Sequence, residues 1–296
     1  MKTFLDEMGL NAGKRARLHR IMYGFGPKNG RAVFLPVDQG LEHGPRDFVP
    51  NWDAADSRWL FKLAKEGNFN AIVLQIGQAE KYFWEFAGEV PLVLKVNGKT
   101  EIPPDDEAFS PCQSSVEDAV RLGADAVGYT MYVGSPAQDK DFIQFRQVRE
   151  ECDRWGMPLI VWSYPRGSAV NKKGGRDSLY QVSYAARVVA ELGGDFVKIN
   201  FPKPGAVENV PKPYDEWSKM EPLEAAKHAI QSAQRTPVLI SGGEKGEDES
   251  IVEKARLSFE AGATGLIFGR NMFQRKLDDA LRLCDRLQEL ASKFPQ

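Results

Sequence analysis

Short apolar runs recur along the chain, and each is followed by a loop and then by a stretch in which apolar residues stand three and four positions apart. A short apolar run is typical of a buried strand, and the longer stretches are typical of amphipathic helices. The strands are predicted at 32–37, 71–76, 92–96, 126–131, 159–162, 196–199, 238–240 and 265–268, and helices at 114–122, 141–155, 178–192, 222–234 and 249–261. This alternation indicates parallel βα units.

The number of these units favours one architecture. Eight βα units within about 250 residues predict a (β/α)8 TIM barrel, here with an extra N-terminal helix over 12–22. The alternative is a doubly wound sheet, which would usually show G-x-G-x-x-G after its first strand, whereas the first strand here runs into VDQGLEHG. No linker rich in Gly, Pro or Ser divides the sequence. We therefore expect one barrel domain over 1–296.

Composition and charge limit the classes of partner that this protein is expected to bind. The 296 residues are 42% hydrophobic and 27% charged, as in ordinary globular proteins. The 39 basic and 41 acidic residues give a net charge of −2, so we expect no nucleic-acid or membrane-surface partner. Neither a signal peptide nor an apolar run of about 18 residues is evident. The three cysteines form no C-x-x-C pair, which favours a reducing compartment, the cytoplasm by default.

Candidate chemistry begins on the sixth predicted strand, FVKIN, because active sites of barrels are built at the carboxyl ends of strands. Alternation places Lys198 on the opposite face from Val197 and Ile199, and therefore inside the barrel. A buried ammonium either pairs with a carboxylate or loses its proton. A neutral amine there would be a nucleophile for a Schiff base with a carbonyl substrate. The alternative is a structural ion pair with Asp38.

Two aromatic residues on the fifth predicted strand and an aspartate on the first extend this candidate site. Trp162 and Tyr164 share one face, and Tyr164 stands at the strand end. We expect a neighbouring ammonium to lower the pKa of this phenol, which could then act as general acid and base; simple core packing is the alternative. Asp38 could accept a hydrogen bond from a substrate hydroxyl or from the lysine.

A second lysine and a histidine complete the polar set. Lys95 lies on the third predicted strand, where its charge would lower the pKa of a second interior lysine, or would simply neutralise Asp38. His43 follows Asp38 in the same loop and is a candidate substrate contact. His19 and His228 fall in helical stretches, so the chain offers no histidine set for a catalytic zinc. We therefore expect no metal.

Glycines at the ends of the last two predicted strands indicate a phosphate site. Barrels commonly bind phosphate in the loops after their seventh and eighth strands, through backbone N–H groups. Ser241, Gly242 and Gly243 follow the seventh strand, and Gly269 and Arg270 follow the eighth. Arg270 would add a bidentate donor. The Pro-rich stretch 201–214 is predicted to be a long loop at the same end of the barrel.

These segments together resemble the archaeal-type class I fructose-1,6-bisphosphate aldolases of the DeoC/LsrF-like aldolase family. The resemblance rests on VDQGLEHGP, LKVNGKT, VWSYPRG, FVKIN, SGGEK and GLIFGRNMFQR, in that order. It implies that Lys198 forms the Schiff base, that Tyr164 transfers protons, and that Asp38 lies near the imine with Trp162 beside the tyrosine. It also implies phosphate ligands at Ser241, Gly242, Gly243, Gly269 and Arg270.

The same resemblance implies reversible cleavage of fructose 1,6-bisphosphate to dihydroxyacetone phosphate and glyceraldehyde 3-phosphate, as in glycolysis and gluconeogenesis. It implies no cofactor and no metal, a phosphorylated sugar as the partner, and homo-oligomers, often decamers. Two alternatives stay open at this point. One is a different Schiff-base aldol or transaldol enzyme, such as an aminodideoxyheptulosonate synthase. The other is a phosphosugar-binding protein without turnover.

Overall fold

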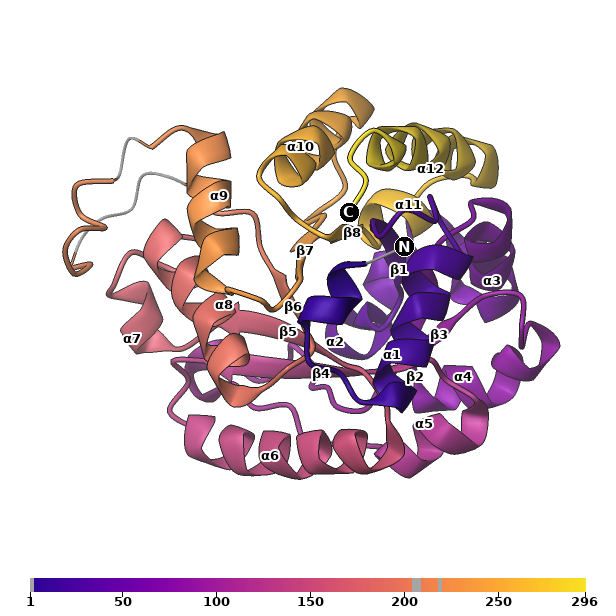
Figure 1. The fold of residues 1–296 in the computed structure, drawn as a ribbon, viewed down its shortest axis with the longest axis horizontal. Coiled ribbons are helices and arrows are strands. Elements are labelled where there is room, and N and C mark those ends of the chain that lie inside the picture. The colour runs from indigo at the N-terminus through magenta and orange to yellow at the C-terminus, as the bar shows by residue number, and fades with distance from the viewer. Residues whose placement is uncertain (1–2, 204–208, 218–219) are drawn as a thin grey trace.

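The chain folds into a closed barrel of eight parallel strands, as the sequence predicted (Figure 1). The structure is a computed structural model that describes residues 3–203, 209–217 and 220–296. Each strand pairs with the next along the chain, and β8 closes the barrel on β1. The strands are β1 (Ala32–Pro36), β2 (Ala71–Gln75), β3 (Leu92–Lys95), β4 (Ala126–Val133), β5 (Leu159–Pro165), β6 (Phe196–Ile199), β7 (Val238–Ser241) and β8 (Gly265–Ile267).

Helices surround the barrel, as Figure 1 shows. They are α1 (Ala12–His19), α2 (Gln39–His43), α3 (Ser57–Glu66), α4 (Ile76–Tyr82), α5 (Val116–Leu122), α6 (Gln138–Trp155), α7 (Ser168–Asn171), α8 (Leu179–Leu192), α9 (Pro222–Ser232), α10 (Asp248–Glu260), α11 (Arg270–Phe273) and α12 (Leu277–Ser292). Gly123 and Gly193 end α5 and α8 in the left-handed conformation, with φ of 73° and 86°. No helix within the described residues is long and apolar enough to cross a membrane.

Alternation along each strand divides the core into two layers. On β6, Val197 and Ile199 pack outward against the helices, in the same cluster as residues such as Val161 of β5. Phe196 belongs to a second cluster that fills the barrel interior, together with Trp162 of β5. The polar side chains that reach the interior therefore do so among apolar neighbours, where an unpaired charge is costly.

The largest difference from the predicted elements concerns β4 and β5. Both strands continue past the predicted ends at 131 and 162, because they pair residue by residue from Val127 with Leu159 to Val133 with Pro165. This long ladder places Tyr164 within β5 rather than after it. Tyr164 is thereby fixed by backbone pairing on the strand, two positions beyond Trp162 and on the same face.

The N-terminal helix closes one end of the barrel. Helix α1 spans Ala12–His19 and continues as a π-helical turn over Arg20–Gly24, close to the predicted range 12–22. Leu18 packs into the interior cluster. Lys14 reaches the start of β6, where its Nζ lies 2.8 Å from Asp195 Oδ2 and 2.6 Å from Asp153 Oδ1. This closed end is opposite the carboxyl ends of the strands.

Both described chain ends lie at this closed end. The Gln296 backbone N–H donates to the carbonyl of Asn29, which precedes β1, at 2.9 Å. The Phe4 ring lies 6.4 Å from the Phe196 ring at the start of β6. Figure 1 shows the two ends near each other. The loop predicted over 201–214 lies between β6 and α9 in the chain, and its residues 204–208 are outside the described part.

Candidate active site

A cavity of about 600 Å³ opens at the carboxyl ends of the strands and collects nearly all the predicted site residues. Ten of them line it: Asp38, His43, Trp162, Tyr164, Lys198, Ser241, Gly242, Gly243, Gly269 and Arg270. The remaining one, Lys95, is buried at the end of β3 and is absent from the cavity lining, with only 3% of its surface exposed. The residues predicted from strand ends therefore converge on a single site.

Lys198 is the central titratable group of this cavity. Only 5% of its surface is exposed, and its Nζ forms a hydrogen bond with the Tyr164 hydroxyl. Burial is the main cause that lowers the pKa of Lys198 to about 7, and the positive charge of Lys95 lowers it further against the opposing charge of Asp38. A large fraction of this amine is therefore neutral at neutral pH. A neutral amine is a competent nucleophile toward a carbonyl carbon.

Asp38 does not form the structural ion pair with Lys198 that the sequence left open. Its Oδ2 accepts instead from Lys95 Nζ at 3.0 Å, and none of the ion pairs among the described residues involves Lys198. The other oxygen, Oδ1, is buried and has no hydrogen-bond partner in the described part of the chain. Because Asp38 lines the cavity, Oδ1 is available to accept a hydrogen bond from a substrate hydroxyl.

The Trp162 ring lies close to both interior lysines. Lys95 Nζ lies 5.0 Å from the centroid of the Trp162 ring, and Lys198 Nζ lies 5.5 Å from it. An aromatic face stabilises a nearby cation while it excludes water. The indole therefore helps to exclude water from both amines, and this desolvation is the largest cause of the lowered pKa of Lys198.

The expectation of a lowered pKa for Tyr164 was wrong. Burial raises the pKa of Tyr164 well above its usual value, and the carboxylates of Glu42 and Asp38 raise it further. A lowered pKa would require a fully charged lysine beside the phenol, whereas about half of Lys198 is neutral at neutral pH, and burial and two carboxylates act in the opposite direction. Tyr164 is thus a protonated phenol in the resting protein, ready to donate rather than to accept a proton.

The glycines at the predicted phosphate site are sterically required. A Cβ on Gly242 would lie 2.7 Å from the side-chain nitrogen of Asn271, and one on Gly269 would lie 2.5 Å from the carbonyl oxygen of Pro36. Gly243 adopts φ +77°, which disfavours any other residue. The backbone after β7 and β8 therefore passes close to its neighbours, with Arg270 beside it on the cavity wall.

Several cationic side chains of the cavity were missed from the sequence: Arg46, Arg166, Arg176, Lys203 and Lys254. Arg166 had a signal, since it stands two residues beyond Tyr164 and would reach the same cavity from the end of β5. It lies 3.0 Å from Asp105 Oδ2. Lys254 gave no such signal, because it lies on α10 rather than at a strand end. Its Nζ donates to the Gly242 carbonyl at 3.1 Å.

His43 has an acidic partner within the cavity. His43 lines the cavity, and its Nδ1 lies 2.7 Å from Asp47 Oδ2, which orients the ring. Among residues 3–203, 209–217 and 220–296, no cluster of three or more His, Cys, Asp or Glu side chains could hold a metal ion. The donors that this cavity offers are an amine, a phenol and a set of cations, which suit a carbonyl compound that carries phosphate.

Comparison with known proteins gives the same picture. The family described as DeoC/LacD family aldolase matches residues 32–275. The chain is 39% identical to a Thermoproteus tenax protein named fructose-bisphosphate aldolase class 1, over 89% of this chain and 90% of that protein. It is 32% identical to a Methanocaldococcus jannaschii protein named fructose-bisphosphate aldolase/6-deoxy-5-ketofructose 1-phosphate synthase, over 88% of this chain and 81% of that protein.

A solved structure extends the similarity to three dimensions. It is an archaeal fructose-1,6-bisphosphate aldolase whose catalytic lysine is covalently bound to the carbinolamine intermediate of its substrate. The match has a TM-score of 0.79 at 36% identity and covers 93% of this chain and 99% of that one. The likeness therefore includes nearly the whole barrel.

Proposed function

This chain belongs to the DeoC/LacD family of aldolases, and on that premise we propose that it is a class I fructose-1,6-bisphosphate aldolase. The observation that carries the proposal is the buried, unpaired Lys198, whose pKa of about 7 leaves it nucleophilic at neutral pH. A binding protein without turnover has no need of such an amine, whose desolvation costs stability.

The first half of the reaction uses Lys198 and Tyr164 in turn. The neutral amine attacks the C2 ketone of the sugar, and the amine proton passes to the ketone oxygen to give a carbinolamine. The Tyr164 phenol, which forms a hydrogen bond with Lys198 Nζ, donates its proton to the departing hydroxyl. Water leaves, and the site then holds an iminium cation beside a phenolate. The new cation stabilises the phenolate that burial otherwise disfavours.

The second half runs on that phenolate. It takes the proton of the C4 hydroxyl while the C3–C4 bond breaks, and the bonding electrons pass into the iminium to form an enamine. Glyceraldehyde 3-phosphate leaves, and Tyr164 is again a phenol. Tyr164 gives its proton to C3, which restores the iminium beside a phenolate. Water then hydrolyses the iminium to dihydroxyacetone phosphate and neutral Lys198, and the proton that is released returns to Tyr164. The free Oδ1 of Asp38 supports a hydrogen bond to a substrate hydroxyl during these steps.

A bisphosphate fits the distribution of charge around Lys198. The turn over Ser241, Gly242 and Gly243 with Arg270 supports one phosphate, beside the three-carbon half of the sugar that stays bound as the enamine. Arg166 and Arg176, which line the same cavity on the segment that follows Tyr164, are the cations that we propose for the other phosphate.

No metal has a place in this mechanism, because the iminium supplies the electron sink. We therefore propose that the enzyme needs no cofactor. Turnover of fructose 1,6-bisphosphate should be unchanged by EDTA. A loss of activity that a divalent ion restores would contradict the class I assignment.

Covalent trapping tests the proposal most directly. Borohydride reduces an iminium to a stable secondary amine, so incubation with dihydroxyacetone phosphate and borohydride should add to Lys198 one substrate mass, less the water lost and plus the two hydrogens gained. Peptide mass spectrometry locates the label. Lys95, which is buried nearby and paired with Asp38, serves as the internal control and should stay unmodified. Label on Lys95, or no label on any lysine, would refute the assigned chemistry.

A second substrate deserves a parallel assay, because the Methanocaldococcus relative is named for 6-deoxy-5-ketofructose 1-phosphate synthesis as well. That reaction would use the same lysine, so trapping does not separate the two activities. The two activities are separated by comparing kcat/KM for cleavage of fructose 1,6-bisphosphate with kcat/KM for synthesis of 6-deoxy-5-ketofructose 1-phosphate. We further propose, from the family resemblance, a cytoplasmic homo-oligomer, which analytical ultracentrifugation and localisation of a tagged chain would test.

A further inference from the structure

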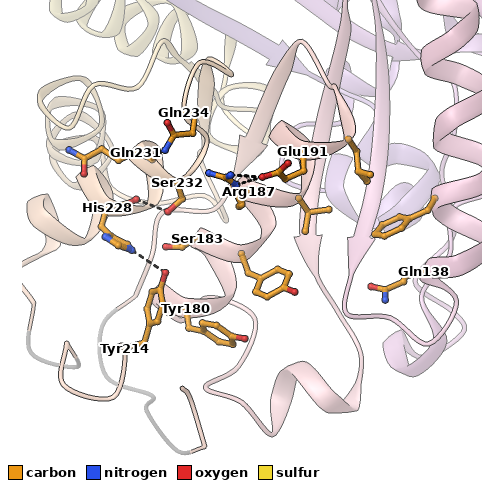
Figure 2. Close-up of a pocket in the computed structure, with 14 residues that line it drawn as sticks. Gln138, Tyr180, Ser183, Arg187, Glu191, Tyr214, His228, Gln231, Ser232 and Gln234 are labelled. Carbon is orange, nitrogen blue, oxygen red and sulfur yellow. Dashed lines mark hydrogen bonds and ion pairs between the residues drawn. The ribbon is translucent and has the colours of Figure 1, made fainter. Parts of the chain in front are cut away.

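A second cavity of about 800 Å³ lies outside the barrel, over α8 and between α6 and α9 (Figure 2). Aromatic side chains supply much of its wall: Tyr180 and Tyr184 from α8, Phe142 from α6, His228 from α9, and Tyr214 from the loop before α9. The Tyr180 ring lies 5.1 Å from the Tyr214 ring and 5.8 Å from the Tyr184 ring, with each pair in an edge-to-face arrangement. None of these residues takes part in the mechanism above.

The charges on this wall cancel. Arg187 Nε donates to Glu191 Oε1 at 2.7 Å, so the one cation and the one carboxylate that line the cavity neutralise each other. Burial lowers the pKa of His228, which therefore stays neutral at neutral pH, and its Nε2 lies 3.1 Å from the Tyr214 hydroxyl. The wall is therefore unlike the cationic active site and offers nothing to hold a phosphate.

One polar group in the cavity is left without a partner. Ser183 is 2% exposed, it lines the cavity, and its Oγ makes no hydrogen bond within the described part of the chain. A second serine of the wall differs in this respect, because Ser232 Oγ donates to the His228 carbonyl at 2.9 Å. A buried hydroxyl without a partner costs stability, and a bound molecule with one hydrogen-bonding atom would remove that cost.

We propose that this cavity binds an uncharged aromatic molecule that carries a hydrogen-bonding atom for Ser183. Its volume lies within the range of about 300 to 1,000 Å³ that is usual for small-molecule sites. Tyrosine and histidine rings present edges and faces that favour contact with another ring. The cancelled charges favour a neutral ligand over the phosphorylated sugars of the active site.

The cavity is connected to the active site through the start of α8. Tyr180 lies three residues after Asp177, which lines the catalytic cavity. Asp177 Oδ1 accepts from the Asn200 amide at 2.8 Å, and Asn200 Oδ1 accepts from the Ser241 hydroxyl at 2.7 Å. A ligand that packs on Tyr180 therefore acts on the hydrogen bonds that hold the proposed phosphate turn. The cavity would therefore be an effector site, and binding there should change the KM for the bisphosphate.

An uncharged fluorescent probe tests the site without knowledge of the natural ligand. N-phenyl-1-naphthylamine emits strongly when it leaves water for an apolar site, so titration of the protein should show saturable binding with one probe per chain. Two separate variants, Tyr184→Ala and Ser183→Leu, should each weaken this binding by about tenfold or more, the first by removing a wall and the second by filling the cavity. Trp84→Ala is the matched control, because Trp84 is a 73% exposed aromatic residue outside the cavity.

Four outcomes decide the proposal. Loss of binding in both variants, with retention in Trp84→Ala and with a change in KM when the probe saturates the wild-type protein, supports it. Binding that both variants leave unchanged overturns it. The proposal is also overturned if the wild-type protein is an oligomer that does not bind the probe and if sedimentation shows that Tyr184→Ala dissociates it. The cavity would then be covered by a second copy of the chain. Binding with unaltered KM and kcat overturns the effector role. Covalent trapping on Lys198 is measured separately and tests the aldolase proposal alone.

Discussion

Strand β6 has a buried lysine at each of its ends, and the two lysines have opposite properties. At the closed end, Lys14 lies against Asp195, just before the strand, and at the open end Lys198 lies within the strand. Burial is similar, with 4% and 5% of each residue exposed. Burial tends to lower the pKa of both lysines, but the carboxylates of Asp195 and Asp153 outweigh it and raise the pKa of Lys14. The pKa of Lys198 falls to about 7.

The contrast shows that pairing, more than burial, decides what a buried lysine does. Lys95 makes the same point within the active site, because it takes the carboxylate of Asp38 that would otherwise have paired with Lys198. A paired lysine fixes structure, and an unpaired one becomes reactive. The fold therefore places a stabilising lysine of α1 beside the start of β6 and a nucleophilic lysine within the same strand. Substitutions at either end should affect different measurements.

The largest effect is expected from Lys198→Ala. No other group can form the iminium, so kcat for bisphosphate cleavage should fall by at least about 10⁴-fold, and borohydride labelling should disappear. Steady-state kinetics and mass spectrometry measure the two effects. The unfolding midpoint in urea should not fall, because the variant removes a desolvated amine that has no ion pair. Substantial remaining cleavage would show that the reactive lysine lies elsewhere.

At the closed end, Lys14→Met should reduce stability and leave chemistry intact. The substitution leaves the buried carboxylate of Asp195 without its lysine partner. Loss of one partner of a buried pair should lower the free energy of unfolding by about 3 kcal/mol. Urea denaturation measures this change, and labelling of Lys198 should persist. The double variant Lys14→Met/Asp195→Asn removes both charges and should recover part of the loss. Equal stabilities of the single variant and the wild type would contradict the proposed role of Lys14.

Tyr164→Phe separates proton transfer from imine formation at the open end. The ring stays in place and only the proton carrier is lost, so cleavage should fall by about 10²-fold or more, while borohydride trapping of dihydroxyacetone phosphate should fall less. Rates of trapping and of cleavage, measured on the same preparation, give the comparison. Tyr132→Phe is the control, since Tyr132 pairs with Tyr164 across β4 and β5 and does not line the catalytic cavity. A wild-type cleavage rate in Tyr164→Phe would show that Tyr164 is not the proton carrier of the mechanism.

The smallest effect is a shift in pH dependence. The reactive form of Lys198 is the neutral amine, so kcat/KM should fall about tenfold per pH unit below its pKa of about 7. Lys95→Met removes a positive charge and frees Asp38, and both changes favour the charged form of Lys198. The acid limb of the profile should therefore move to higher pH by about one unit. Asp38→Asn should move it to lower pH, and a common direction for the two variants would contradict this account.

The fold was predictable from sequence because barrel strands carry strong local signals. Each of the eight predicted strands exists and begins at the predicted residue, and every strand end except that of β5 agrees to within two residues. The extension of β5 to Pro165 was not predictable, since it depends on pairing with β4 rather than on the apolar run itself. Helix ends at Gly123 and Gly193 were readable because glycine alone takes the left-handed conformation cheaply.

The site was predictable where residues stand at strand ends, and less so elsewhere. Position and alternation found Lys198, Trp162 and Tyr164, because inward direction follows from the strand period. They did not find Lys254, which reaches the cavity from the middle of α10. The predicted direction of the Tyr164 pKa was also wrong, since that pKa depends on burial and on the approach of Glu42 from α2. Pairwise electrostatics requires distances, and a sequence supplies none.

Both described chain ends lie at the closed end of the barrel, where Gln296 bonds to Asn29 and Phe4 packs beside Phe196. For anyone who wishes to immobilise this protein on a solid support, that location is favourable. A tether attached at either end would anchor the molecule by its closed face and point the open mouth toward the solution. Sugars could then diffuse in and out unhindered, so attachment at the termini should leave turnover close to that of the free protein.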